Sequence, residues 1–328
     1  MGTRADTTGI KKPKLGRCKT VPLPASLAGR LRLPAIASPM FLVSGPDLVV
    51  ETCKAGILGT FPALNQRTSE GYVAWLDEIE ERLADIPDAA PFGVNLIVHR
   101  SNPRLEADLA ITAQHKVPLV ITSLGAVPDL VKAVHGYGGL VFHDVISLRH
   151  AQKAAEAGVD GIIAVAAGAG GHAGTMSPFA LVSEIRRFFG GTIVLAGAIS
   201  TGAQIAAAQM MGADLAYLGT RFIATTESLA DPAYKDMLLR SHAADILYTP
   251  AISGVHANFM RESIQAAGLD PDNLVSHGKL DLGNEAKVWK TIWSAGQGVG
   301  AIEDVPTTAE LGARLLTEYR QARASLSG

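Results

Sequence analysis

The sequence has few cysteines and no long hydrophobic run. Cys18 and Cys53 are the two cysteines among 328 residues, and their spacing matches no metal-binding or redox motif. We therefore expect no metal site and a reducing environment. No apolar segment reaches the roughly 18 residues that a membrane-spanning helix needs, and the N-terminus lacks the apolar core of a signal peptide. These absences predict a cytoplasmic protein without a membrane partner.

The charge of the chain is also low. Charged residues make up 18% of the sequence, the formal net charge is -2 and the pI is about 6.5. Proteins that bind nucleic acid usually carry a strong basic footprint, so we exclude that class and expect a small-molecule substrate. The basic residues between positions 11 and 19 are interpreted as a solvated N-terminal arm. The length and the 48% content of hydrophobic residues suit one large α/β domain or two ordinary ones.

Beyond residue 30, short apolar runs alternate with amphipathic stretches. Eight runs have the composition of buried strands: 35 to 40, 57 to 63, 92 to 98, 118 to 124, 139 to 145, 161 to 167, 192 to 199 and 215 to 223. Between them, apolar residues recur three and four apart, which is typical of helices. Several of these stretches begin at a capping residue, as at Ser69, Ser147 and Ser177, and close on Gly158 or Gly212. The alternation predicts an α/β fold, a (β/α)8 TIM barrel, with a doubly wound open sheet as the alternative.

The alternation stops after the eighth run. The segment from 228 to 285 has helical patterns followed by a polar stretch, so we predict a helical insertion that covers the barrel mouth as a mobile lid. A last helical pattern, from 307 to 326, returns the chain to the barrel. The predicted domains are an N-terminal extension (1 to 30), the barrel (31 to 227 and 286 to 328) and the helical lid insertion (228 to 285).

The stretch from 161 to 174, GIIAVAAGAGGHAG, is the most informative part of the chain. An apolar run ends there in clustered glycines, which let the backbone approach a ligand closely. His172 is the one titratable residue in this stretch, and an imidazole suits proton transfer near neutral pH. A dinucleotide-binding loop is disfavoured, because the next strand ends without an acidic residue for a ribose. A histidine bonded to the loop backbone remains the structural alternative.

In a barrel of this class the active site lies at the carboxyl ends of the strands. The residues that end the runs include Met40, Asn95, Ser123, His143, Asp144, His172, Gly197, Gly219 and Thr220. The seventh and eighth runs end in AGAIST and LGTR, where backbone N–H groups and a following helix can hold a phosphate. We therefore expect a phosphorylated cofactor or substrate. Several candidates have structural alternatives: Met40 as core packing, Asn95 as a helix cap, His143 and Asp144 as partners of each other or of the backbone, and Gln297 as a turn residue.

Six short motifs follow one another in a recognisable order. They are SPM (38 to 40), PFGVNL (91 to 96), AGAGGHAG (167 to 174), AGAIST (196 to 201), LGTRF (218 to 222) and SAGQG (294 to 298). Together they resemble the nitronate monooxygenase family, formerly called 2-nitropropane dioxygenases. The resemblance extends from about residue 30 to residue 310, and its most specific element is GGHAG.

The resemblance implies an FMN-dependent (β/α)8 barrel that needs no metal and oxidises alkyl nitronates and nitroalkanes with O2. It implies that FMN is bound by Met40, Asn95, Gly171, Gly197, Gly219, Thr220 and Gln297. His172 corresponds to the catalytic histidine, which takes the α-proton from a nitroalkane. Ser123 and His143 are expected to contact the substrate. A homodimer is compatible with the sequence.

Related flavin enzymes share many of these motifs, so the reaction transfers less securely than the fold. NAD(P)H-dependent reduction of a quinone or an enoyl thioester is the alternative, and a flavin- or phosphate-binding protein without activity is a more distant one. One position departs from several relatives, which carry a lysine after the histidine of the fifth strand. Here Asp144 follows His143. An acidic group near the ring would disfavour an anionic reduced flavin.

Overall fold

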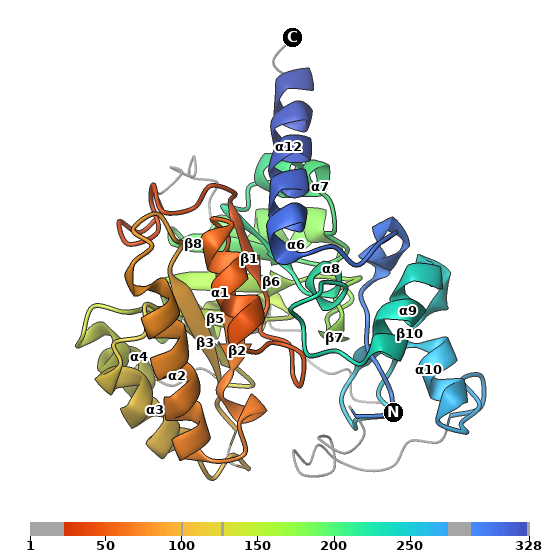
Figure 1. Cartoon of the computed structure of the whole chain (residues 1–328), viewed down its shortest axis with the longest axis horizontal. Helices are drawn as coiled ribbons and strands as arrows, with labels where there is room; N and C mark the ends of the chain where they lie inside the picture. Colours follow the sequence, from red (N-terminus) through yellow and green to blue (C-terminus); the bar gives the residue numbers. More distant parts are fainter. Residues whose placement is uncertain (1–22, 100, 126–127, 275–289, 327–328) are drawn as a thin grey trace, which may run out of the picture.

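The structure is a computed structural model that describes residues 23–99, 101–125, 128–274 and 290–326. Eight parallel strands form a closed barrel in the order β1-β2-β3-β4-β5-β6-β8-β9 (Figure 1). They are β1 (Ala35–Ala37), β2 (Leu58–Pro62), β3 (Phe92–Ile97), β4 (Leu119–Ser123), β5 (Leu140–Val145), β6 (Gly161–Val165), β8 (Thr192–Ala196) and β9 (Leu215–Leu218). Each strand falls within one predicted run, so the TIM barrel is confirmed.

Alternate residues along the strands form two separate clusters. Residues such as Ile36, Ile121 and Phe142 pack together inside the barrel, and their neighbours pack outward against the helices. This separation is expected for strands with one face in a barrel and the other under helices. Leu27 is 1% exposed and joins the inner cluster, although it lies in the segment expected to be an extension. The basic arm from 11 to 19 lies outside the described residues.

A ring of helices covers the barrel. It comprises α1 (Pro46–Lys54), α2 (Ser69–Ala84), α3 (Leu105–Gln114), α4 (Pro128–His135), α5 (Leu148–Glu156), α6 (Pro178–Arg186), α7 (Gly202–Met210) and α12 (Thr308–Ser325). Thr68 caps α2, one residue before the predicted cap at Ser69, and accepts a hydrogen bond from the Gly71 N–H. Ser147 caps α5 as predicted. No helix in the described ranges is long and apolar enough to cross a bilayer.

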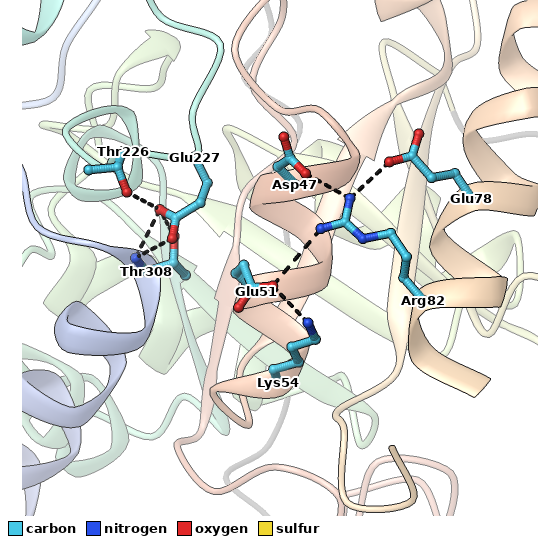
Figure 2. Close-up of polar contacts among 8 residues, drawn as sticks. All are labelled: Asp47, Glu51, Lys54, Glu78, Arg82, Thr226, Glu227 and Thr308. Atoms are coloured by element: carbon cyan, nitrogen blue, oxygen red, sulfur yellow. Dashed lines mark hydrogen bonds and ion pairs between the residues drawn. The ribbon is translucent and has the colours of Figure 1, made fainter. Parts of the chain in front are cut away.

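Figure 2 shows how α2 contacts α1 at the surface. The Arg82 guanidinium lies 2.7 Å from Asp47 and 2.8 Å from Glu78, and 3.9 Å from Glu51. Exposed ion pairs of this kind contribute at most about 1 kcal/mol each. The buried side chains of α2, among them Leu76, therefore contribute more to holding this helix on the barrel.

The segment after β9 is only partly helical. It contains α8 (Thr220–Ile223), α9 (Pro232–Arg240), η2 (Ala243–Asp245), β10 (Ile246–Thr249), β11 (Ala257–Met260) and α10 (Arg261–Ala266). The prediction of a helical insertion holds for α9 and α10, but the segment also contains strands, because β10 and β11 form an antiparallel pair and β11 also pairs with β7 (Gly171–His172). The polar stretch from 275 to 289 lies outside the described residues.

The two ends of this inserted segment meet at the barrel. The Thr226 N–H donates to the Pro306 carbonyl at 3.0 Å. The Glu227 carboxylate accepts hydrogen bonds from the N–H and hydroxyl of Thr308, at the start of α12 (Figure 2). The chain thus leaves the barrel after β9 and returns to the same place, from which α12 packs along α7.

Candidate active site

A cavity of about 1480 Å³ lies at the carboxyl ends of the barrel strands, against the inserted segment. Pockets for a single small ligand usually measure about 300–1000 Å³, so this cavity has room for a cofactor and a substrate together. The predicted site residues that line it are Met40, Asn95, Ser123, His143, Gly171, His172, Gly197, Gly219 and Thr220. The fold therefore brings together nine of the ten predicted residues.

Gln297 is the predicted residue that does not line the cavity. It is exposed at the start of η3 (Gln297–Ala301), and its backbone N–H donates to the Gly168 carbonyl at 2.8 Å. Its neighbours Gly296 and Gly298 line the cavity instead. The motif SAGQG therefore contributes backbone to the cavity wall, in agreement with the turn interpretation of Gln297.

The loops after β8 and β9 form one end of the cavity. Gly197 and Ala198 have positive φ values of 133° and 54°, which turn the backbone sharply after β8. Ser200 is 3% exposed, and its hydroxyl has no hydrogen-bond partner within the described residues. Thr220 accepts a hydrogen bond from the Gly296 N–H at 2.9 Å, so its hydroxyl hydrogen can still be donated.

A buried hydroxyl without a partner costs about 1–3 kcal/mol. An acceptor-rich group such as a phosphate, bound beside Ser200 and Thr220, would remove that cost. Ser200 was not among the predicted residues although it belongs to the motif AGAIST. The motif identifies the loop, but only the fold reveals that this hydroxyl is buried and has no partner among the residues described.

Asn65 fixes the loop after β1, which carries Met40. Its amide donates to the carbonyls of Met40 (3.1 Å) and Ser44 (2.7 Å) and accepts from the Leu42 N–H at 2.9 Å. Leu42 has a positive φ of 61°, a strained conformation for a leucine that these contacts hold in place. Asn65 lies in η1 (Ala63–Asn65), and no sequence signal identified it. Met40 is thereby held at the cavity wall next to Gly219.

Three polar side chains from adjacent strands form the floor of the cavity. The Asn95 amide donates to the Ser123 hydroxyl at 2.8 Å, and that hydroxyl donates to Asp144 Oδ2 at 2.6 Å. Ser123 and Asp144 lie two residues beyond Ile121 and Phe142 of the inner cluster, so they also face the barrel interior.

His143 occupies the opposite face of β5 from Asp144. Its Nδ1 lies 2.7 Å from the hydroxyl of Thr122, and 5% of the residue is exposed. Burial lowers the pKa of His143 to about 4. The imidazole is therefore neutral near pH 7. Its position toward the helix layer makes it a weaker candidate for a substrate contact than Asp144.

Burial acts in the opposite direction on Asp144, because it disfavours the charged form of any side chain. It raises the pKa of Asp144 to about 6, although the Ser123 hydrogen bond and the electrostatic attraction of His172 oppose this shift. Asp144 is thus a carboxyl group that changes its protonation state close to neutral pH.

The inserted segment holds the loop that carries His172. In the three-stranded sheet His172 lies opposite Ala257, and the Gly171 N–H donates to the Ser294 hydroxyl at 2.6 Å. The same hydroxyl donates to the Asn258 carbonyl at 2.5 Å. The Asn258 amide in turn donates to the Ala169 carbonyl at 2.6 Å. The glycine-rich loop is therefore positioned by the segment beyond the barrel.

The site thus combines a histidine, a half-buried carboxyl group and two loops suited to a phosphate. These groups can accept or hold a proton beside a bound phosphorylated cofactor. This combination is suited to proton abstraction coupled to oxidation or reduction.

The comparisons with known proteins agree with this arrangement. The nitronate monooxygenase family model matches residues 28–318. The chain is 31% identical over 287 residues to the nitronate monooxygenase of Paraburkholderia phytofirmans, which covers 73% of this chain and 76% of that protein. It is similar to the structure of a nitroalkane oxidase from Streptomyces ansochromogenes, with a TM-score of 0.77, 25% identity, and coverage of 92% of this chain and 100% of that one.

A FabK variant from Thermotoga maritima is similar as well. Its TM-score is 0.77 and its identity 25%, and the match covers 94% of this chain and 99% of that chain. The family model covers most of the barrel and the whole of the cavity lining, including the glycine-rich loop. The chain belongs to the nitronate monooxygenase family and is an oxidoreductase.

Proposed function

We propose that the protein binds FMN and oxidises nitroalkanes and their nitronates with O2 as the electron acceptor. The observation that carries the proposal is the position of His172, which lines the same cavity as the two phosphate-suited loops. The similarity to a nitronate monooxygenase and a nitroalkane oxidase supports the choice of substrate class.

The cofactor site is proposed from the fit between the chain and the phosphate of FMN. Ser200 supplies a buried hydroxyl that lacks a partner in the part of the chain that the structure describes, and Thr220 supplies a second hydroxyl. A side chain at Gly219 would have its Cβ 2.7 Å from the Ser38 hydroxyl, so this position must stay small. Met40, Asn95 and Gly171 line the rest of the cavity and are proposed to contact the isoalloxazine ring.

His172 is proposed as the general base for neutral nitroalkanes. Its loop is held by β11 and Ser294, so the imidazole is oriented before a substrate arrives. A base that is already oriented can take the α-proton without a further loss of conformational entropy. A nitronate has already lost that proton and requires only binding and orientation by the cavity. FMN supplies the electron-accepting chemistry when it is bound.

The test is anaerobic mixing of the purified protein with a nitronate or with NADH, while the flavin absorbance is followed. Bleaching by the nitronate and re-oxidation by O2 support the proposal. Rapid bleaching by NADH, with no reaction of the nitronate, would instead identify an NAD(P)H-dependent reductase of a quinone or an enoyl thioester.

A further inference from the structure

Asp144 is unusual for its position in the barrel. The structure describes every residue of the eight barrel strands, and Asp144 is the only Asp, Glu, Lys or Arg among them. It also faces the interior, in the same direction as Phe142 of the inner cluster. The other interior positions at the cavity floor are uncharged, as in Val165, Ala196 and Tyr217. A charge at this position therefore acts on whatever occupies the inner cavity.

Only one of the two oxygens of the Asp144 carboxyl group has a hydrogen-bond partner among the described residues. Oδ2 accepts the hydrogen bond from Ser123, whereas Oδ1 is buried and has no partner among the described residues. An ionised carboxylate in such surroundings lacks much of the stabilisation that water would give it. Burial accordingly raises the pKa of Asp144 to about 6.

The groups around Asp144 offer little compensating positive charge. The titratable side chains that interact electrostatically with Asp144 are His172, from β7, and Tyr217, from β9. On α5, which packs on β5, His150 acts on His143. Arg67, Lys153 and Lys290 line the cavity too, but all three are exposed and therefore screened by solvent. Arg104, which is less exposed, is paired with Asp108 at 2.9 Å.

We propose that Asp144 weakens the binding of anions in the inner cavity at neutral pH, so that the cavity favours neutral ligands and binds an anion, a nitronate included, most tightly when Asp144 carries a proton. Two like charges in a partly buried site repel each other strongly, because few solvent molecules screen them. Where the inference concerns the preference for a neutral nitroalkane over its nitronate anion, it rests on the proposed function. The effect of Asp144 on anion binding is independent of that function.

The sign of the pH effect follows from this arrangement. Below about pH 6 Asp144 is mostly protonated and an anion meets no opposing charge. Above that pH the protonated fraction falls about tenfold for each pH unit, and the affinity of an anion that requires the protonated form falls equally. A neutral ligand has no such dependence on Asp144.

The experiment is a calorimetric titration of the purified protein with nitrate between pH 5 and pH 8. Nitrate is a planar anion that resembles a nitronate and is not itself oxidised. Wild-type protein should bind it with constant affinity below about pH 6 and lose about tenfold per unit above. Asp144→Asn keeps the shape and can still accept from Ser123, so it should bind nitrate up to about 100-fold more tightly at pH 8 and without that slope.

Two further variants distinguish Asp144 from other titrating groups. Ser123→Ala removes the hydrogen bond that stabilises the carboxylate, so the pKa of Asp144 rises and the midpoint should move to higher pH. His172→Asn also removes a group that favours the carboxylate, so the slope should persist with a raised midpoint. Asp129→Asn changes the net charge equally at an exposed residue of α4 and should leave the titration unchanged.

Three results would overturn the proposal: an unchanged slope in Asp144→Asn, an unmoved midpoint in Ser123→Ala, or loss of the slope in His172→Asn. The Ser123→Ala result decides the matter if Asp144→Asn does not fold. A protein that shows the expected nitrate titration but oxidises no nitronate would contradict the proposed function and still support this inference.

Discussion

The two sides of the cavity are built differently. The floor and the phosphate-suited loops follow directly from barrel strands, whose ladder fixes where Asn95, Ser123 and Asp144 lie. Another wall includes the inserted segment, whose strands β10 and β11 form a small sheet with β7 from the loop after β6. His172 lies on β7 and therefore belongs to both sides. The comparison shows that the barrel strands and their loops supply the residues of the proposed cofactor site, whereas the insertion fixes the position of the proposed base.

The first prediction concerns whether the inserted segment can fold without the barrel. Expressed alone, residues 228 to 285 should be unfolded by circular dichroism. Apolar residues of this segment, such as Tyr234 and Leu238, pack in one cluster with Val43 and Ile223 of the barrel side. Without these partners the segment buries too little apolar surface to fold. A cooperative thermal transition of the isolated segment would contradict the shared core.

The second prediction concerns His172, where the two sides meet. His172→Asn should lower kcat/KM for a neutral nitroalkane by about 10²- to 10⁴-fold, because a positioned base contributes about that much. The same variant should change kcat/KM for the preformed nitronate only modestly. Steady-state oxygen consumption with both substrates provides the measurement. Equal losses on the two substrates would mean that His172 orients the nitro group rather than removing a proton.

The third prediction isolates the barrel side. Gly219→Asp should weaken FMN binding on the order of 10³-fold, because a carboxylate would lie beside the phosphate and like charges in contact cost several kcal/mol. Gly219→Ala is the matched control, since both variants place a Cβ close to Ser38. The difference in flavin content and dissociation constant between the two measures the charge effect. Equal FMN affinity in both would show that the phosphate lies elsewhere.

The fourth prediction isolates the inserted side. Ser294→Ala leaves the Gly171 N–H and the Asn258 carbonyl without their shared partner, at a cost of about 1–3 kcal/mol. It should lower both the free energy of unfolding and kcat while FMN stays bound. Ser263→Ala is the control, because Ser263 accepts a similar hydrogen bond from the Trp293 N–H. That control should lose stability, measured by urea denaturation, with kcat unaffected.

The fifth prediction has the smallest expected effect. Ser200→Ala should weaken FMN binding about tenfold, the equivalent of about 1.5 kcal/mol for a hydrogen bond to a charged group. Thr52→Val is the control, because Thr52 also has a buried hydroxyl without a described partner but lies outside the cavity. Fluorescence titration with FMN separates the two. A similar loss in both variants would remove Ser200 from the proposed phosphate site.

The barrel could be predicted from the sequence because each strand is a short, nearly unbroken apolar run. The number of strands and their order follow from the regular alternation of these runs with helical stretches. The end of the eighth run was less clear, because its last four residues, Thr220–Ile223, are buried but form the short helix α8. Apolar content alone does not separate a strand from a short buried helix.

The hairpin of the insertion could not be predicted in the same way. β10 and β11 are four residues each, and β11 depends on pairing with β7, which lies more than 80 residues earlier in the chain. Local spacing carries no information on such a partner. The orientations of His143 and Asp144 could not be predicted for a related reason, since the faces of β5 are assigned only once its neighbours are known.

The two ends of the inserted segment lie side by side, and this has a consequence for exchanging the segment between proteins of this family. Thr226 and Glu227 meet Pro306 and Thr308, so the intervening chain begins and ends at nearly one point on the barrel. Segments attached at one point often tolerate changes of length, but this one shares a core with Val43 and Ile223 and supplies Ser294, which holds the loop of His172. Exchange of the segment between homologues should therefore change the substrate range and the position of His172 together.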